Sequence, residues 1–126
     1  MIILKVPFEI PVKNIDPNDP IEFGEFVSVC KDCVGRHRNG EPIFGVASED
    51  IVNTGWMILN TGLVVKAKFH KTYKPVFGDE VCLDRSRKYF CQYEGSIVGM
   101  VISESEVFLY PYHRHNINSI SSLNLL

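Results

Sequence analysis

The chain has 126 residues and a formal net charge of −2, with 45% hydrophobic and 22% charged residues, as in an ordinary globular protein. This balance provides no positive field that would gather nucleic acid or anionic lipid. No apolar run approaches the roughly 20 residues of a membrane span, and the start lacks a secretory leader, so we expect a cytoplasmically made protein without membrane association.

Residues 2–12 place apolar side chains on even positions, which predicts an extended segment with one apolar face. Pro7 and Pro11 lack an N–H and share the odd positions, so one edge of this strand cannot form a regular ladder. Turn residues at 16–20 then separate the segment from the body. We therefore predict an N-terminal arm over residues 1–20 that serves attachment more than stability. It pairs either within its own sheet or with a partner.

The sequence predicts a β domain over residues 21–112, followed by a polar tail at 113–126. Short runs rich in β-branched and aromatic residues alternate with turn residues. The predicted strands are 25–30, 43–47, 56–59, 63–69, 80–84, 89–93, 96–103 and 107–110. Residues 60–62 are predicted as a hairpin loop and 31–39 as a charged loop. No amphipathic helix is recognisable, so the predicted fold class is all-β, a small barrel or sandwich.

Two parts of the chain resemble each other at an offset of 54 residues. The offset pairs Gly24 with Gly78, Val27 with Val81, Ile43 with Ile97 and Gly45 with Gly99. Two copies are too few for a solenoid, so we predict one domain built from two similar strand units. The two glycines that interrupt strands, Gly45 and Gly99, should occupy matching places. We expect both isoleucines to be buried beside them.

The four cysteines do not have the spacing of a structural zinc site. Cys30 and Cys33 form a CxxC, whereas Cys82 and Cys91 are spread over two predicted strands, and zinc ribbons usually present two tight pairs. We interpret Cys82 and Cys91 as small reduced core residues, and Cys30 as the end of a strand. We predict neither a metal nor a cofactor.

No recognisable catalytic motif occurs in the sequence. An acid–base site could be assembled from either of two sets of residues, but no spacing supports it. The sets are His70, Lys71, Tyr73 and Asp79, or Asp84 with Arg85 and Arg87. A G-x-S-x-G elbow, a phosphate-binding glycine loop and an HExxH are all missing from the sequence. We predict that the protein is not an enzyme.

Five stretches, rich in glycine, valine and acidic turn residues, follow one another in a characteristic order. They are GEFVSV at 24–29, PIFGVASED at 42–50, TGLVVKA at 61–67, FGDEVCLD at 77–84 and EGSIVGMVISE at 94–104. This order resembles the capsid decoration, or head cement, proteins of tailed bacteriophages. The arm, the charged loop and the polar tail depart from that pattern. The resemblance implies a virion protein that is made in the host cytoplasm, binds the major capsid protein on the outside of the lattice and strengthens the head without catalysis.

The apolar row of the arm is the predicted capsid-binding site, because an extended chain can add a strand to a partner's sheet. Its residues are Ile2, Leu4, Val6, Phe8 and Ile10. Self-association is a further option. The alternative function is a small barrel that binds single-stranded nucleic acid through Tyr89, Phe90 and Tyr93 beside Arg85, Arg87 and Lys88. Alternation separates Phe90 from the two tyrosines and the net charge is negative, so nucleic acid is the less favoured partner.

Overall fold

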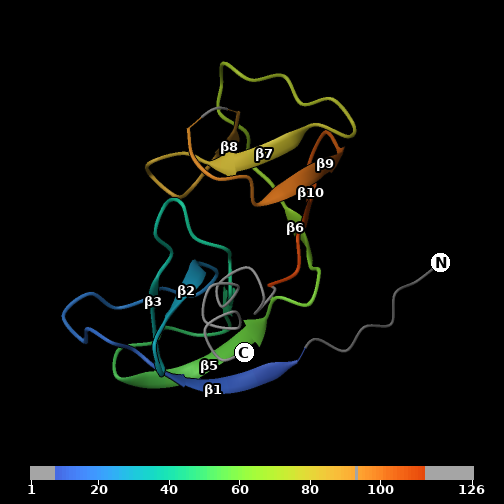
Figure 1. Cartoon of the computed structure of the whole chain (residues 1–126). Helices are drawn as coiled ribbons and strands as arrows, with labels where there is room; N and C mark the ends of the chain where they lie inside the picture. The colour runs from blue at the N-terminus through green and yellow to red at the C-terminus, as the bar shows by residue number, and fades with distance from the viewer. Residues whose placement is uncertain (1–7, 93, 113–126) are drawn as a thin grey trace, which may run out of the picture.

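The computed structural model describes residues 8–92 and 94–112, and in these ranges the chain is all-β without a helix, as predicted. The ten strands of these described ranges form two five-stranded antiparallel sheets in a sandwich-like arrangement. The first lobe, at the bottom of Figure 1, contains β1 (Glu9–Lys13), β2 (Phe26–Cys30), β3 (Cys33–Arg36), β4 (Gly45–Ala47) and β5 (Thr54–Leu59). The second lobe contains β6 (Val64–Lys66), β7 (Glu80–Leu83), β8 (Phe90–Cys91), β9 (Gly99–Ser103) and β10 (Glu106–Leu109).

The two lobes repeat one architecture. The strand order is β1-β5-β4-β2-β3 in the first sheet and β6-β10-β9-β7-β8 in the second, so β6 to β10 take the places of β1 to β5. In both sheets the first strand also meets the third through an isolated parallel bridge. The bridged pairs are Asn14–Val34 and Phe69–Phe90. The prediction of two similar strand units is confirmed, and the repeat covers both complete sheets.

Close backbone approach explains why Gly45 and Gly99 recur. Gly45 pairs with Leu59 on β5, and Gly99 pairs with Leu109 on β10. A Cβ at either glycine would overlap a backbone carbonyl oxygen of the neighbouring strand. The glycines therefore occupy matching places, as predicted, because the strands come too close there for any side chain.

The expected burial of both isoleucines is wrong for one of them. Ile43 is 2% exposed, but Ile97 is 53% exposed. Ile43 packs into the core of the second lobe, beside Val81 and Leu109, so the neighbouring lobe covers it. In the part of the chain that the structure describes, no third lobe covers Ile97, and the equivalent position is left in solvent.

Residues 9–13, which belong to the predicted N-terminal arm, form β1 at the edge of the first sheet. The amide of Leu59 donates to the carbonyl oxygen of Phe8 over 2.8 Å, so even-numbered residues direct their backbone groups to β5. Pro11 faces the opposite edge, where its missing N–H breaks no ladder bond. This segment therefore pairs within its own sheet, which is one of the two alternatives for the arm.

The charged loop predicted at residues 31–39 contains an additional strand, β3. A two-residue turn joins it to β2, and Lys31 in that turn has a φ of 54°, a conformation usually taken by glycine or asparagine. Only Val34 of this strand is fully buried. The strand escaped prediction because it has neither the usual turn residues nor an alternating apolar pattern.

Residues 60–62 connect the two lobes, whereas the sequence predicts a hairpin loop. Gly62 has the positive φ expected of it, 100°. Asn60 is 1% exposed, and its Nδ2 donates to the carbonyl oxygens of Ile43 and Tyr110, both over 2.9 Å. Its Oδ1 accepts the amide of Gly62 over 3.1 Å. This one side chain therefore ties both lobes to their connection.

Candidate docking surfaces

Only part of the predicted apolar row lies within the described residues, since Ile2, Leu4 and Val6 fall outside them. Phe8 is 68% exposed. Ile10 is half-buried and lines a groove of about 510 Å³ between β1 and β3. The capsid-binding role of the row stays a prediction.

The same tight turn precedes the second strand of each lobe. The two turns span residues 22–25 and 76–79, and in both the fourth residue donates its amide to the carbonyl oxygen of the first over 3.0 Å. The third residue is Gly24 in one turn, with a φ of 84°, and Gly78 in the other, with a φ of 91°. A positive φ at this position alone is that of a type II turn.

An acidic residue fixes each of these turns. Glu25 accepts the amide of the first turn residue over 2.7 Å, and Asp79 does the same over 3.3 Å. A neighbouring side chain holds each carboxylate in turn: Arg36 donates to Glu25 over 2.7 Å, and the Tyr73 hydroxyl donates to Asp79 over 2.7 Å. Different neighbours thus stabilise the same turn in the two lobes.

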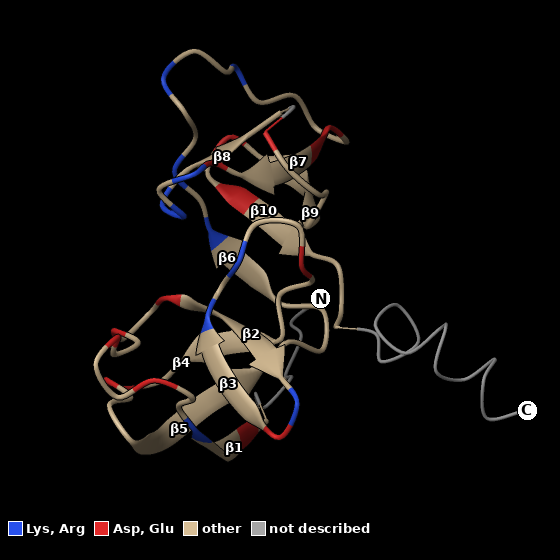
Figure 2. Ribbon diagram, turned by 60° about the vertical axis from the view of Figure 1, so that its left-hand side comes forward, with Lys and Arg blue, Asp and Glu red and all other residues tan. Residues whose placement is uncertain are grey.

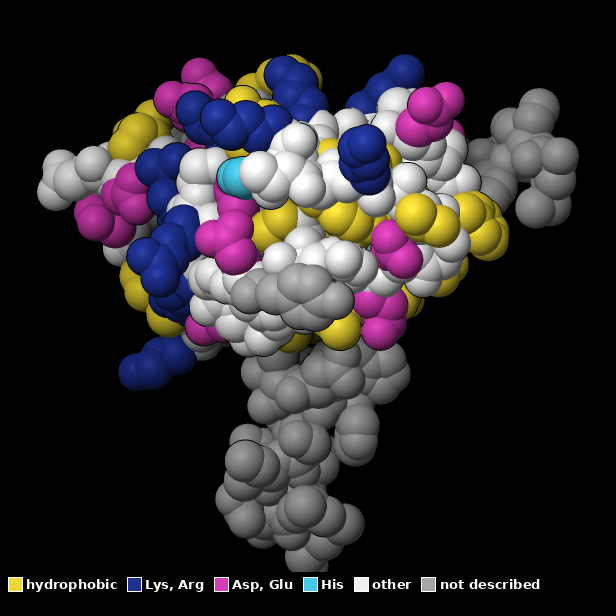
Figure 3. Space-filling view, turned by 90° about the horizontal axis from the view of Figure 1, so that it is seen from above, with side chains coloured by type: hydrophobic (Ala, Val, Ile, Leu, Met, Phe, Trp, Pro, Cys, Tyr) yellow, Lys and Arg dark blue, Asp and Glu magenta, His cyan; other side chains and the backbone are white. Residues whose placement is uncertain are grey.

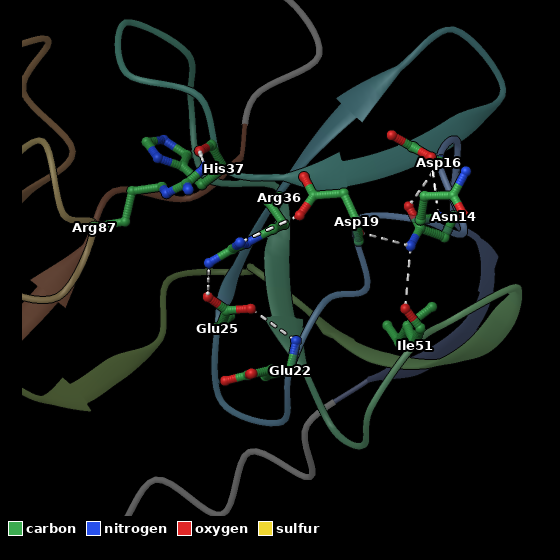
Figure 4. A network of polar contacts seen from close by, with 10 residues as sticks. Asn14, Asp16, Asp19, Glu22, Glu25, Arg36, His37, Ile51 and Arg87 are labelled. Atoms are coloured by element: carbon green, nitrogen blue, oxygen red, sulfur yellow. Dashed lines mark hydrogen bonds and ion pairs between the residues drawn. The ribbon is translucent and has the colours of Figure 1, made fainter.

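Arg36 is itself part of a wider polar network in the first lobe (Figure 4). Its second guanidinium nitrogen donates to Asp19 over 3.2 Å. The hydrogen bond to Glu25 raises the pKa of Arg36 above its usual value. In addition, Asp50 accepts the amide of Phe23 over 2.8 Å. The 22–25 turn is therefore held by three side chains.

A phenylalanine stands at the tip of both turns. Phe23 is 71% exposed and Phe77 is 74% exposed. The turn geometry requires the glycine, and the acid caps the backbone, but neither needs an aromatic residue before the glycine. The preceding exposed residue differs between the lobes, being Glu22 in one and Val76 in the other. The phenylalanine is thus shared without a structural reason.

The two exposed phenylalanines are part of the repeat that is visible in the sequence. Phe23 and Phe77 are 54 positions apart, the same offset as the repeated glycines beside them. Sequence reasoning missed them because a repeated apolar residue in a β unit is expected to be buried. Only the structure shows that both side chains lie in solvent.

Basic residues gather along one side of the second lobe in Figure 2, and Figure 3 shows several basic side chains next to one another at the left of the molecule. Residues 63–112 contain seven Lys or Arg and six Asp or Glu, whereas residues 8–62 contain four and nine. Four of these cations line the basic groove, a hollow of about 320 Å³ against the 22–25 turn of the first lobe. They are Lys66, Lys68, Arg87 and Lys88. Within the described ranges, ion pairs involve only first-lobe cations.

The residues predicted for nucleic-acid binding are only partly brought together. Tyr89 is 39% exposed and lines the basic groove, whereas Phe90 is 2% exposed and belongs to the core. Tyr93 lies outside the described residues. Arg87 donates to the carbonyl oxygen of His37 over 3.1 Å and so bridges the lobes. Sequence spacing could not reveal that Lys66 of β6 and Lys68 line this groove, because the parallel bridge at Phe69–Phe90 brings their segment there.

The cysteine, tyrosine and aspartate side chains considered for metal binding or catalysis make structural contacts. Cys82 and Cys91 face each other across β7 and β8 with their sulfur atoms 3.8 Å apart, and burial raises the pKa of the Cys91 thiol. Tyr73 and Asp79, which could have served acid–base chemistry, hold the 76–79 turn. Among residues 8–92 and 94–112, no group of three or more His, Cys, Asp or Glu side chains could hold a metal ion.

No protein-family model, curated protein or solved structure matches this chain. No helix long and apolar enough to cross a membrane occurs in the described ranges.

Proposed function

We propose that this chain is a structural protein that binds the outer surface of a bacteriophage capsid and stabilises the head. The proposal rests on a surface feature that occurs twice. One chain presents the same turn, with the same exposed phenylalanine, from two units of one architecture. Two like contact points suit a partner that itself repeats, as the subunits of a capsid lattice do.

The resemblance to capsid decoration proteins supports this proposal, because it follows the repeated backbone. The stretches at 24–29 and 77–84 carry the turn glycine and the strand after it, β2 or β7. The stretches at 42–50 and 94–104 carry β4 and β9 with their interrupting glycines. Corresponding motifs therefore occupy corresponding places in the two lobes.

A head-stabilising protein needs contact surface and a rigid frame. An aromatic side chain buries about 150–250 Å² when it is covered, and at about 25 cal/mol per Å² this area provides several kcal/mol before the entropy of association is subtracted. Two such contacts in one chain reinforce each other, since the second forms at a high effective concentration once the first is made. In this chain the exposed phenylalanines would supply the contact surface, and the two sheets would supply the frame.

Binding to empty heads tests the proposal. The heads would be assembled from the major capsid protein encoded in the same genome, and sedimented with increasing amounts of the purified chain. We expect saturable binding at a fixed ratio to the capsid protein, together with a higher melting temperature of the heads. Heads that bind no protein and melt unchanged would contradict the proposal.

The basic groove favours a second candidate function, the binding of single-stranded nucleic acid. Its four cations lie beside the half-exposed ring of Tyr89, which also lines an adjoining hollow with His70 and Lys71. A charged groove with an exposed aromatic ring is how many small barrels hold a single strand. Four phosphate contacts would give a slope of about −3 for log affinity against log salt. Fluorescence anisotropy with a labelled thymidine oligonucleotide measures it, and no binding at low salt would exclude this candidate.

A further inference from the structure

We propose that Phe23 and Phe77 are the two anchor residues of the capsid contact, each inserting into an apolar pocket on one of two like capsid subunits. This inference rests on the proposed function and names the residues that would perform it. The exposure of 71% and 74% leaves both rings available to a partner.

Comparison of the two lobes distinguishes these residues from two other exposed apolar side chains, Val64 and Ile15. Val64 of β6 occupies the position that Glu9 has in β1. Val64 pairs with Phe108 and Glu9 pairs with Ile58, and these two partners are equivalent residues of β10 and β5. Ile15 corresponds to His70, since the amides of both donate to the carbonyl oxygen at the third strand. These exposed apolar positions change character between lobes. At the turn tip the phenylalanine is kept.

The structure also separates the role of each turn residue. The glycines have a positive φ, and a Cβ at either one would meet no atom within 4 Å, so the space beside each glycine is open. Glu25 and Asp79 close the turns through hydrogen bonds of their carboxylates. The backbone thereby fixes where each ring emerges. A fixed presentation lowers the entropy lost on binding, which favours an anchor role.

Contacts between the two lobes hold Phe23 and Phe77 at a fixed separation, so the two anchor residues act as one bivalent binding surface. The Phe26 and Phe90 rings meet edge to face with centroids 6.0 Å apart. Asn39 donates to the carbonyl oxygen of Glu94 over 3.0 Å. Together with the Asn60 contacts, these interactions hold the lobes against each other. A fixed separation between anchors fits a partner whose pockets recur at fixed spacing, as on a lattice of identical subunits.

The test compares four variants on the same empty heads: Phe23→Ala, Phe77→Ala, the double variant, and Ile97→Ala as a control at another exposed apolar position, 53% exposed. Removing an exposed ring should leave the melting temperature within about 2 °C of the original. Each single change should weaken binding on the order of tenfold or more, as expected for an aromatic anchor. The double variant should lose about the product of the two factors or more. The control should bind like the unchanged chain.

The outcomes distinguish this inference from the proposed function. If the unchanged chain binds heads and the double variant binds equally well, the anchor assignment is overturned while the function stands. A loss from one position alone overturns the two-anchor arrangement. If the unchanged chain does not bind, both proposals fail. Self-association that the double variant abolishes, with head binding retained, assigns the rings to a second copy and also overturns the inference.

Discussion

Gly45 and Gly99 occupy the same place in the two lobes, each where the backbone of the next strand leaves no room for a Cβ. Either substitution by alanine should destabilise the fold by about 1–3 kcal/mol, the range of overpacking changes in a packed interior. Urea unfolding measures the loss. Gly24→Ala provides the comparison, because space is open there and only the positive φ opposes it, at a loss of about 1 kcal/mol. If Gly45→Ala and Gly99→Ala were both as stable as the unchanged chain, the neighbouring strands could not approach these positions as closely as the structure shows.

Asn60 joins the lobes through a side chain that both donates and accepts. Asn60→Asp keeps the shape but places a carboxylate against the carbonyl oxygens of Ile43 and Tyr110, which can only accept. Asn60→Ala leaves the same buried groups without a partner. We expect losses of about 2–4 kcal/mol in either variant, since each unsatisfied buried group costs about 1–3 kcal/mol. Thermal unfolding measures this, and a shift of less than about 2 °C would show that the lobes are held together elsewhere.

The burial of His37 should make the stability of the folded chain depend on pH. It is 2% exposed, its Nε2 lies 2.9 Å from the carbonyl oxygen of Glu41, and burial lowers its pKa below the usual value. Arg87 and Arg38 act in the same direction. Below about pH 6.5 the unfolded chain therefore binds more protons at this site than the folded chain.

The contribution of His37 is fully present above about pH 6.5 and is lost as the pH falls towards its lowered folded-state pKa. Urea titrations at a series of pH values should show this decline. His37→Gln should flatten it, whereas His70→Gln, at a half-buried position, should retain it. An unchanged pH dependence in His37→Gln would assign the effect to other groups.

Residues 9–13 form an edge strand of the first sheet and should therefore contribute to stability, although the sequence predicts an arm that serves attachment more than stability. Ile10 directs its backbone to β5, and Pro11 faces the free edge. Ile10→Pro should therefore destabilise the first lobe by about 3 kcal/mol, whereas Pro11→Ala should stay within about 0.5 kcal/mol. Deleting residues 1–13 should lower the melting temperature on the order of 10 °C. Equal tolerance of both point variants would mean that β1 is dispensable.

Local patterns were sufficient to predict most strands and the relation between the two units. Alternation and turn residues located β2, β5, β7 and β10 to within a few residues. The offset of 54 paired the turn glycines and the strand-interrupting glycines because backbone geometry demands glycine at both places. Outside that window the offset changes, to 55 between Asn14 and Phe69, since loop lengths differ. The complete duplication was therefore hidden in the sequence.

Properties that depend on how the lobes meet could not be predicted. Ile43 and Ile97 are equivalent in sequence, and only the neighbouring lobe decides that one is buried. The basic groove likewise combines β6 and the β7–β8 connection with a first-lobe turn. Exposure of Phe23 and Phe77 depends on the direction of a turn, which the apolar pattern does not encode.

The composition of purified virus particles tests the central claim most directly. Particles would be freed of loosely bound protein, and the ratio of this chain to the major capsid protein would be measured by quantitative mass spectrometry, with surface labelling of intact particles. If the chain is a structural protein of the outer capsid surface, we expect a fixed ratio across preparations and labelling of the chain before the capsid is opened. Particles that are complete and stable without this chain, or that contain it only inside the closed head, would contradict this role.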